Sequence, residues 1–402
     1  MRILMISNLY PPYFLGGYEL LCANVVHDLQ ELGHDIHVLT SSYGLTTPVQ
    51  ERNIDRILKL YIPFGQPASM ARQKRKRTHR FNYAVATRKI AEIKPDIVFV
   101  WSQLRLTLGA GMAAQDMGVP VAFTMNDEHI RSYIPARKRS TGRQLLRTLL
   151  DATLYRLITT RDLALDHVTC ISGQLKQSLL DSGLPIEKAE VIYQGIPLKR
   201  FPLKKHPADL HNPIRLCYVG QLHEYKGVHL AVSALGQLNQ NNPGRYQLTI
   251  VGTGDASYMD QLQTSVKDLS IDQYVHFVGR VENAQVPQYY RQNDILLLTS
   301  TWEEPFGLTH LESMASGTVV ISTFRGGMKE FLRDEENCLI FDPEQERHLA
   351  TQIERLVHDD TLRRRLVQTA REMVISRFSV GRYVNDLEQF LQRAIKKQEQ
   401  LA

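Results

Sequence analysis

Two carboxylates stand eight positions apart in the stretch EEPFGLTHLE, which covers residues 303–312. Glu304 precedes a Pro-Phe-Gly turn, and Glu312 lies about one turn into the helix that the following apolar spacing predicts. The backbone N–H groups of residues 307–309 would be free donors at that helix start, which is a ready site for an anion. A phosphate there would leave one carboxylate on each side for hydroxyl groups, whereas the alternative interpretation is ordinary helix capping.

A lysine occupies a similar position earlier in the chain. The stretch YVGQLHEYKGVHL, residues 218–230, predicts a strand that ends near Gly220, a loop with Gln221, and Lys226 just before a helix. A lysine beside a helix start can neutralise a diphosphate and stabilise the negative charge that develops when the diphosphate leaves. The alternative is a solvated lysine on the surface.

Two pairs of glycines also follow predicted strands. Gly16 and Gly17 precede the first predicted helix, and the stretch RGGMKE covers residues 325–330. Because glycine has no side chain, the pair in RGGMKE permits a close approach of the backbone to a ligand. The Gly16-Gly17 turn by itself does not indicate a ligand site.

The elements that must position these residues follow from short β-branched runs that alternate with helical patterns. The expected strands lie at residues 2–7, 35–41, 96–101, 120–125, 215–220, 247–252, 274–279, 294–300 and 318–324. Continuous apolar runs of this kind are typical of parallel strands buried on both faces. The alternation predicts an α/β fold with two Rossmann-like parallel-sheet domains that face a central cleft, where a ligand binds.

Four prolines and little periodicity mark residues 195–213 as a connection between the two predicted sheets. We therefore predict an N-terminal domain at residues 1–195, a linker at 196–212 and a C-terminal domain at 213–375. A charged helix at residues 376–402 follows, and we expect it to pack back on the N-terminal domain.

Composition argues against several classes of protein. A chain of 402 residues with 43% apolar and 22% charged residues is typical of a globular protein with about two domains. No apolar run approaches the roughly 18 residues of a membrane span, and the apolar run at the N-terminus is too short for a signal peptide. The four cysteines have no metal-ligand spacing and suit a reducing compartment. We therefore expect a cytoplasmic protein without a metal.

The net charge of +6 is unevenly distributed. Residues 1–200 carry 26 Lys and Arg against 17 Asp and Glu, and residues 201–402 carry 22 against 25. The basic excess concentrates in RQKRKRTHR, residues 72–80, and in the arginines of residues 131–147. These segments are either solvated surface or sites for a phosphorylated substrate or an acidic membrane. The candidate anion ligands are Arg72, Lys74, Arg75, Lys76, Arg77 and Arg105.

Together these segments resemble the family-4 retaining glycosyltransferases of the GT-B type. The resemblance runs in family order through PPYFLGGYE, GHDIHVLT, CISGQLKQSLLDSG, VIYQGIP, GQLHEYKG, HFVGRV, EEPFGLTHLE and ASGTVVISTFRGGMKE. The two glutamates around Phe-Gly are its most specific part. The resemblance implies that the N-terminal domain binds the acceptor and the C-terminal domain binds a nucleotide-sugar donor.

The resemblance also implies roles for single residues. Lys226 would bind the donor diphosphate, Glu304 would touch the donor sugar, and Glu312 would hold the ribose hydroxyls. The other donor-binding residues would be Gly16, Gly17, Gly220, Gln221, Arg280, Val281, Phe306, Gly307, Leu308 and Thr309. The implied reaction is metal-independent and cofactor-free transfer with retention, to a sugar, sugar-phosphate or lipid-linked acceptor, in polysaccharide or glycoconjugate biosynthesis.

Two positions depart from the family pattern. Gln221 stands where the family commonly has arginine, which removes one positive charge from the diphosphate site. Asn126, the third candidate catalytic residue, stands where a histidine is often found, and Asp127 follows it as an acceptor candidate. Asparagine can donate a hydrogen bond to a sugar hydroxyl but cannot act as a base. His129 is expected to point elsewhere.

These departures keep other functions open. A catalytically inactive nucleotide-sugar-binding protein would tolerate Gln221 and Asn126, and a nucleotide-sugar epimerase of the same fold would need acid and base groups on the sugar. No nucleic-acid partner is expected. The basic segment at residues 72–80 fits either a loop that captures a sugar phosphate or peripheral docking on the inner face of an anionic membrane.

Overall fold

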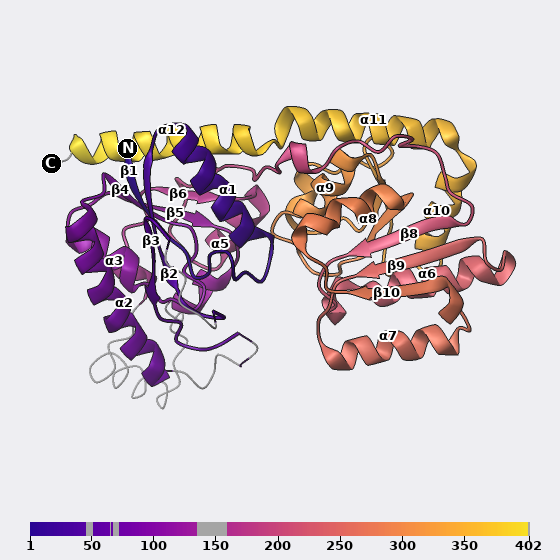
Figure 1. Ribbon diagram of the computed structural model, residues 1–402, viewed down its shortest axis with the longest axis horizontal. Coiled ribbons are helices and arrows are strands. Elements are labelled where there is room, and N and C mark those ends of the chain that lie inside the picture. The colour runs from indigo at the N-terminus through magenta and orange to yellow at the C-terminus, as the bar shows by residue number, and fades with distance from the viewer. Residues whose placement is uncertain (46–50, 65, 67–71, 135–158, 401–402) are drawn as a thin grey trace. The chain divides into compact units, whose positions relative to one another are not determined.

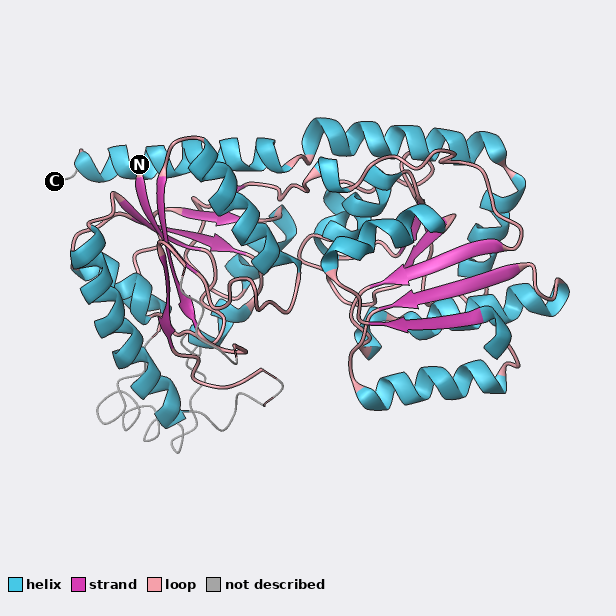
Figure 2. Ribbon diagram, viewed as in Figure 1, coloured by secondary structure: helices cyan, strands magenta, loops and turns pink. Residues whose placement is uncertain are grey.

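The computed structural model describes residues 1–45, 51–64, 66, 72–134 and 159–400 (Figure 1). The chain forms two compact units. The first contains Met1–Tyr193 together with Val384–Ala402, and the second contains Gln194–Tyr383. Each unit has its own parallel β-sheet with helices packed on it (Figure 2).

The first unit is built on a parallel sheet with the strand order β3-β2-β1-β4-β5-β6-β7. Its strands are β1 (Arg2–Ile6), β2 (Asp35–Ser41), β3 (Ile54–Leu58), β4 (Ile97–Val100), β5 (Val121–Met125), β6 (Val168–Cys170) and β7 (Glu190–Val191). Its described α-helices are α1 (Gly17–Glu31), α2 (Arg72–Ile93), α3 (Gly109–Asp116) and α5 (Gly173–Asp181), joined by part of α12 (Val380–Glu399).

The central strands of this sheet are buried on both faces, as their continuous apolar runs predict. In β1, Ile3 pairs in register with Ile36 of β2 and with Ile97 of β4, and all three side chains are at most 1% exposed. Helix α1 buries Leu21, Cys22, Val25, Val26 and Leu29. The local sequence pattern therefore accounts for the middle of the sheet.

The second unit has a parallel sheet with the strand order β10-β9-β8-β11-β12-β13. Its strands are β8 (Ile214–Val219), β9 (Tyr246–Val251), β10 (Val275–Gly279), β11 (Ile295–Leu298), β12 (Val319–Ser322) and β13 (Leu339–Ile340). Helices α6 (Val228–Asn241) and α7 (Ala256–Asp268) cover one face of the sheet, and α8 (Val286–Gln292) and α9 (Leu308–Ser316) cover the other (Figure 1). Helices α10 (His348–His358) and α11 (Asp360–Arg377) complete the unit.

In each sheet, successive strands are added first on one side of a central strand and then on the other. The strand order therefore reverses between β1 and β4 in the first unit and between β8 and β11 in the second. Loops diverge at such a switch point, which is where doubly wound sheets bind ligands. The predicted α/β class with two Rossmann-like parallel-sheet domains is confirmed. The strands that the sequence pattern did not predict are β3, β6, β7 and β13, which lie at or next to the sheet edges, and the last three of which have only two or three residues.

The proline-containing residues 196–212 lie within the second unit. The N–H of Ile196 donates to the Phe378 carbonyl at 2.8 Å, and the N–H of Val380 donates to the Ile196 carbonyl at 2.9 Å. Farther along, Lys204 Nζ donates to the Asn293 carbonyl at 3.0 Å. These bonds hold the segment against the second unit.

Candidate active site

Lys226 is positioned by the loop between β8 and α6. A short 3₁₀ helix, Glu224–Lys226, ends at Gly227, whose φ of 65° lies in the left-handed region. A Cβ on Gly227 would overlap the Thr299 carbonyl oxygen, and Thr299 Oγ1 donates to the Lys226 carbonyl at 2.9 Å. The glycine therefore allows the loop after β8 to lie directly against the loop after β11.

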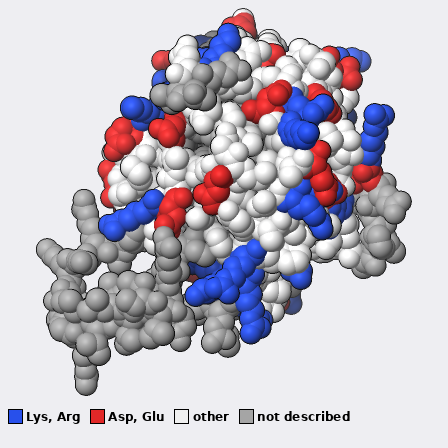
Figure 3. Space-filling model, turned by 90° about the vertical axis from the view of Figure 1, so that its left-hand side faces the viewer, with Lys and Arg blue, Asp and Glu red and all other residues white. Residues whose placement is uncertain are grey.

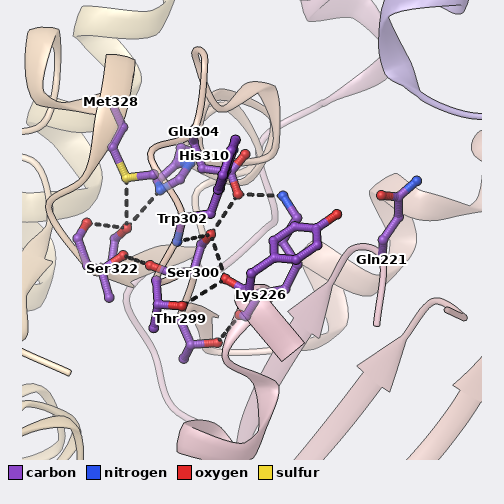
Figure 4. Close-up of polar contacts among 12 residues, drawn as sticks. Gln221, Lys226, Thr299, Ser300, Trp302, Glu304, His310, Ser322 and Met328 are labelled. Atoms are coloured by element: carbon purple, nitrogen blue, oxygen red, sulfur yellow. Dashed lines mark hydrogen bonds and ion pairs between the residues drawn. The ribbon is translucent and has the colours of Figure 1, made fainter. Parts of the chain in front are cut away.

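Glu304 lies on that second loop and forms an ion pair with Lys226 (Figure 4). The lysine Nζ contacts Glu304 Oε1, and Ser300 Oγ donates to the same oxygen at 2.8 Å. The side chains of Lys226 and Glu304 are 21% and 16% exposed. The structure thus brings together two of the three candidate catalytic residues, Lys226 and Glu304, and it adds Ser300, which the sequence analysis did not single out.

The start of α9 follows directly after this pair. Gly307 adopts a φ of 103° and precedes Leu308 and Thr309, so that the N–H groups of the first turn lie at the carboxyl edge of the sheet. Glu312 lies one turn farther on, where the Tyr290 hydroxyl of α8 donates to its Oε2 at 2.8 Å. Burial raises the pKa of Glu312 to about 7. Phe306 is buried beneath the loop against Phe331 and Phe378.

His310 is a buried residue within the motif that the sequence analysis passed over. Its Nε2 lies 2.8 Å from Ser322 Oγ of β12, and burial lowers its pKa to about 3. The ring is therefore neutral and anchors the first turn of α9 to the sheet. The sequence could have pointed to His310 through its position inside EEPFGLTHLE, because a polar residue on the buried side of a short helix needs a hydrogen-bond partner.

The sequence analysis expected the glycine pair after β12 to lie near a ligand. In the structure, the N–H groups of both glycines are hydrogen-bonded to the loop that carries Glu304. The N–H of Gly326 donates to Glu303 Oε2 at 2.6 Å, and the N–H of Gly327 donates to the Glu304 carbonyl at 2.7 Å. Gly326 has a φ of 69°, and a Cβ there would overlap the same carbonyl. Both glycines therefore support the loop that carries Glu304.

Exposed aromatic rings border the ion pair. Tyr225 and Trp302 are 43% and 47% exposed, and their ring centroids lie 6.0 Å apart. Gln221 is also exposed and lies apart from the ion pair (Figure 4). Its carbonyl, which follows Gly220, accepts the Tyr218 hydroxyl at 2.8 Å.

The remaining donor-binding candidates of the second unit, Arg280 and Val281, follow β10. That strand is separated from β8 by β9. Arg280 is exposed, and Val281 is partly exposed.

In the first unit, a small pocket lies at the carboxyl ends of β4 and β5. Asn126 lines it and donates through Nδ2 to the Trp101 carbonyl at 2.8 Å. His129, the first residue of the short helix His129–Tyr133, lines the same pocket. Asp127 Oδ1 accepts the His129 N–H at 2.7 Å, and burial raises the pKa of Asp127.

The first glycine pair caps helix α1. Gly16 is the N-cap, Gly17 begins the helix, and the Gly16 N–H donates to Glu19 Oε2 at 2.9 Å. Glu19 is fully buried, and burial raises its pKa to about 7. Glu19 was missed in the sequence, although it follows the glycine pair in the stretch GGYE.

The basic segment at residues 72–80 is part of helix α2, and is not a loop as one of the two alternatives assumed. Lys74 and Arg77 are exposed, Lys76 is partly exposed, and Arg75 lies over the Tyr133 ring. The Arg72 side chain and the arginines between residues 137 and 147 lie outside the described residues. On the face drawn in Figure 3, Lys and Arg side chains are scattered among Asp and Glu.

Solved structures share the fold of this chain. The structure of sucrose-phosphate synthase from Thermosynechococcus elongatus is similar to that of this chain, with a TM-score of 0.75 and 20% sequence identity. The similarity covers 98% of this chain and 99% of that protein's chain. The HepE protein of Anabaena, in complex with UDP-glucose, is similar over 98% and 100% of the two chains, with a TM-score of 0.72 and 20% identity. The fold is that of the GT-B glycosyltransferases.

Two family models match successive parts of the chain. "Glycosyltransferase Family 4" matches residues 15–200, and "Glycosyl transferases group 1" matches residues 201–373. Glycogen synthase of Mycobacterium tuberculosis is 26% identical over 410 residues, which cover 94% of this chain and 91% of that protein. The chain belongs to the family-4-like GT-B glycosyltransferases, and the predicted resemblance is confirmed.

The described residues contain no group of three or more His, Cys, Asp or Glu side chains placed to hold a metal ion. No helix in the described part of the chain is long and apolar enough to span a membrane.

Proposed function

We propose that this glycosyltransferase moves a sugar from a nucleoside diphosphate sugar to a sugar, sugar-phosphate or lipid-linked acceptor, with retention and without a metal. The observation that carries the proposal is the ion pair of Lys226 and Glu304 beside the start of α9. The complex of the similar HepE protein with UDP-glucose supports a nucleotide-sugar donor. Relatives in glycogen and lipopolysaccharide synthesis support a role in polysaccharide or glycoconjugate biosynthesis.

In this proposal the donor diphosphate binds between Lys226 and the first-turn N–H groups of α9. Both groups are held in place before the reaction, so that they stabilise the charge on the leaving diphosphate without reorganisation. Glu304, held by Ser300, accepts hydrogen bonds from the donor sugar, and Glu312 accepts them from the ribose. Lys226 supplies the positive charge that faces the diphosphate. The sequence contains no Asp-x-Asp motif, which would bind a metal for the same purpose.

The transfer step then needs little from side chains of the first unit. The bond between the anomeric carbon and the diphosphate oxygen breaks, and the acceptor oxygen bonds to the same face of that carbon. The acceptor proton passes to the departing diphosphate, because Asn126 cannot accept it as a base. Asn126 instead offers its amide to a sugar hydroxyl at the edge of the pocket.

The first test is a thermal-shift screen of the full chain against UDP, GDP, ADP and dTDP sugars without metal. Binding to the folded state alone raises the melting temperature, so one nucleotide sugar should stabilise the protein. With that donor, Lys226→Ala and Glu304→Gln should each lower turnover at least about 10²-fold, since each removes one preorganised charge. Lys329→Ala is the matched control, because Lys329 is a partly exposed lysine whose Nζ lies 3.6 Å from Glu303 Oε2.

The outcomes separate the candidate functions. Release of nucleoside diphosphate together with a new glycosidic bond supports transfer. Binding of a donor without turnover would favour a nucleotide-sugar-binding protein, and isomerisation of the donor sugar without transfer would favour an epimerase. Normal turnover of Glu304→Gln would show that the donor sugar does not lie at that carboxylate.

A further inference from the structure

We propose that Arg75 and Arg105 bind a phosphate group of the acceptor, and that the neighbouring pocket of the first unit binds its hydroxylated ring. The inference rests on the proposed function, because it assigns a substrate class to the open acceptor. It concerns residues of the first unit alone.

Arg75 reaches from helix α2 to the short helix His129–Tyr133. Its guanidinium carbon lies 3.6 Å from the centroid of the Tyr133 ring and 5.6 Å from that of Tyr61. One terminal nitrogen, Nη2, donates to the Ser132 carbonyl and hydroxyl at 3.3 and 3.2 Å. The aromatic rings thus hold the guanidinium plane in a fixed place, and a fixed guanidinium is well suited to a phosphate.

Arg105 contacts the same short helix, and its carbonyl accepts the N–H of Tyr61, the residue whose ring lies near Arg75, at 2.9 Å. Its backbone has a φ of 64°, its N–H donates to His129 Nε2 at 3.4 Å, and its guanidinium carbon lies 4.4 Å from the Phe64 ring centroid. The side chain donates to the carbonyls of Ile62 and Pro63. In the described part of the chain, no carboxylate forms an ion pair with Arg75 or Arg105.

Both arginines approach the short helix that carries His129. The Arg105 N–H donates to His129 Nε2, and Arg75 stacks on Tyr133. The pKa of His129 is lowered to about 4, mainly by burial and in the same direction by the charges of Arg75 and Arg105. At neutral pH the imidazole is uncharged, so the two guanidinium groups supply the positive charge. Glu128 does not cancel that charge, because its carboxylate pairs with Arg131 at 2.7 Å. Arg75 and Arg105 are partly exposed, contact residues that line the pocket, and have no acidic partner among the described residues, which favours an anionic ligand beside the pocket.

The pocket itself is suited to hydroxyl groups. Gln103 Oε1 and Thr124 Oγ1 are buried, and in the described part of the chain neither has a hydrogen-bond partner. Both residues line the pocket with Asn126 and Asp127. Buried polar atoms without partners are costly, and a polyol that enters the pocket would satisfy them. The ligand is therefore a hydroxylated ring that carries phosphate, either a soluble sugar phosphate or a lipid-linked sugar phosphate.

The experiment measures binding in a Lys226→Ala background, which removes the lysine that the donor diphosphate would use. Isothermal titration would compare glucose and mannose with their 6-phosphates, with inorganic phosphate, and with a polyprenyl diphosphate-linked hexose in neutral detergent micelles. A phosphorylated sugar should bind at least about 10-fold more tightly than its neutral parent, because charged hydrogen bonds contribute most. The soluble and micellar arms distinguish the two sources of phosphate.

Variants test the two arginines directly. Arg75→Gln and Arg105→Gln should each weaken binding of the phosphorylated ligand about 10- to 100-fold and leave any binding of the neutral sugar unchanged. Arg88→Gln is the matched control on the same helix, since Arg88 is exposed and lies 3.6 Å from Glu92. If Arg75→Gln unfolds, Arg75→Lys keeps the charge and should retain part of the preference.

Equal affinity for neutral and phosphorylated sugars would overturn the inference, as would arginine variants that behave like the Arg88 control. Donor binding by the unmodified protein is measured separately by its thermal shift. A failure of the proposed function would therefore show as a missing donor shift, whereas a failure of this inference would show as a missing preference for phosphate.

Discussion

At the scale of single residues, Glu312 is the carboxyl group of the donor site whose charge changes near neutral pH. Burial raises its pKa to about 7, while the Tyr290 hydroxyl donates to one of its oxygens at 2.8 Å. Because the folded pKa lies above the ordinary value of 4.5, this group lowers the stability of the fold as pH rises from 4.5 to about 7. Above pH 7 it is ionised and can accept two ribose hydroxyls.

We therefore expect the donor to bind more tightly at pH 8 than at pH 6, by up to about tenfold if only the ionised form binds. Titration calorimetry with the stabilising nucleotide sugar would measure this, and Glu312→Gln should remove the dependence. The matched control is Glu19→Gln, because burial also raises the pKa of Glu19 to about 7 in the first unit. If Glu312→Gln kept the pH profile and Glu19→Gln lost it, the titrating group would be Glu19.

At the scale of elements, the contact between the loops after β8 and β11 depends on Gly227. Its φ of 65° disfavours any other residue, and a Cβ would overlap the Thr299 carbonyl oxygen. We expect Gly227→Ala to lower stability by about 1–3 kcal/mol and to reduce turnover, because Lys226 must move with the backbone. Melting curves and steady-state kinetics would measure the two effects.

Gly244→Ala is the control for Gly227→Ala. It introduces the strain of a positive φ without pushing a neighbouring loop away. Gly244 also has a positive φ, of 79°, but the nearest atom to a Cβ there is 3.6 Å away, on Tyr274. This variant should lose about 1 kcal/mol of stability and keep normal turnover. Normal turnover of Gly227→Ala as well would show that the loop contact does not position Lys226.

At the scale of the whole molecule, the first unit is completed by the end of the chain. From Val384 onward α12 belongs to that unit, where His34 Nε2 lies 2.9 Å from Glu388 Oε1 and Arg393 pairs with Glu190 at 2.6 Å. Leu387, Leu391 and Ala394 of the same helix are fully buried. The fold of the first unit therefore needs a segment that follows the entire second unit in sequence.

We expect Leu391→Ala to destabilise the first unit by about 2–5 kcal/mol, the usual effect of a truncated core leucine. Hydrogen exchange should become faster in β1 to β7 and stay unchanged in β8 to β13. Ile375→Ala is the matched control, because Ile375 is an apolar residue of α11 that is 46% exposed. Equally faster exchange in both sheets would mean that the two units unfold together.

Much of the fold and part of the donor site could be predicted from the sequence. The apolar runs of β1, β8 and β11 are local signals, because a strand buried on both faces needs apolar residues at successive positions. The position of Glu304 in a loop and of Glu312 in a helix followed from apolar spacing within one short stretch. Two-residue strands such as β7 and β13 carry too few residues for such a pattern.

The sequence by itself determined the α/β alternation, the strands at the centre of each sheet and the glutamate motif, because these depend on neighbours within about ten residues. The tertiary structure decided which distant groups meet. The pairing of Lys226 with Glu304 requires β8 and β11 to be adjacent in the sheet, and the bond from Tyr290 to Glu312 requires α8 to lie beside α9. The stacking of Arg75 on Tyr133 likewise depends on the packing of α2, since strand order and helix packing arise from contacts that no local pattern encodes.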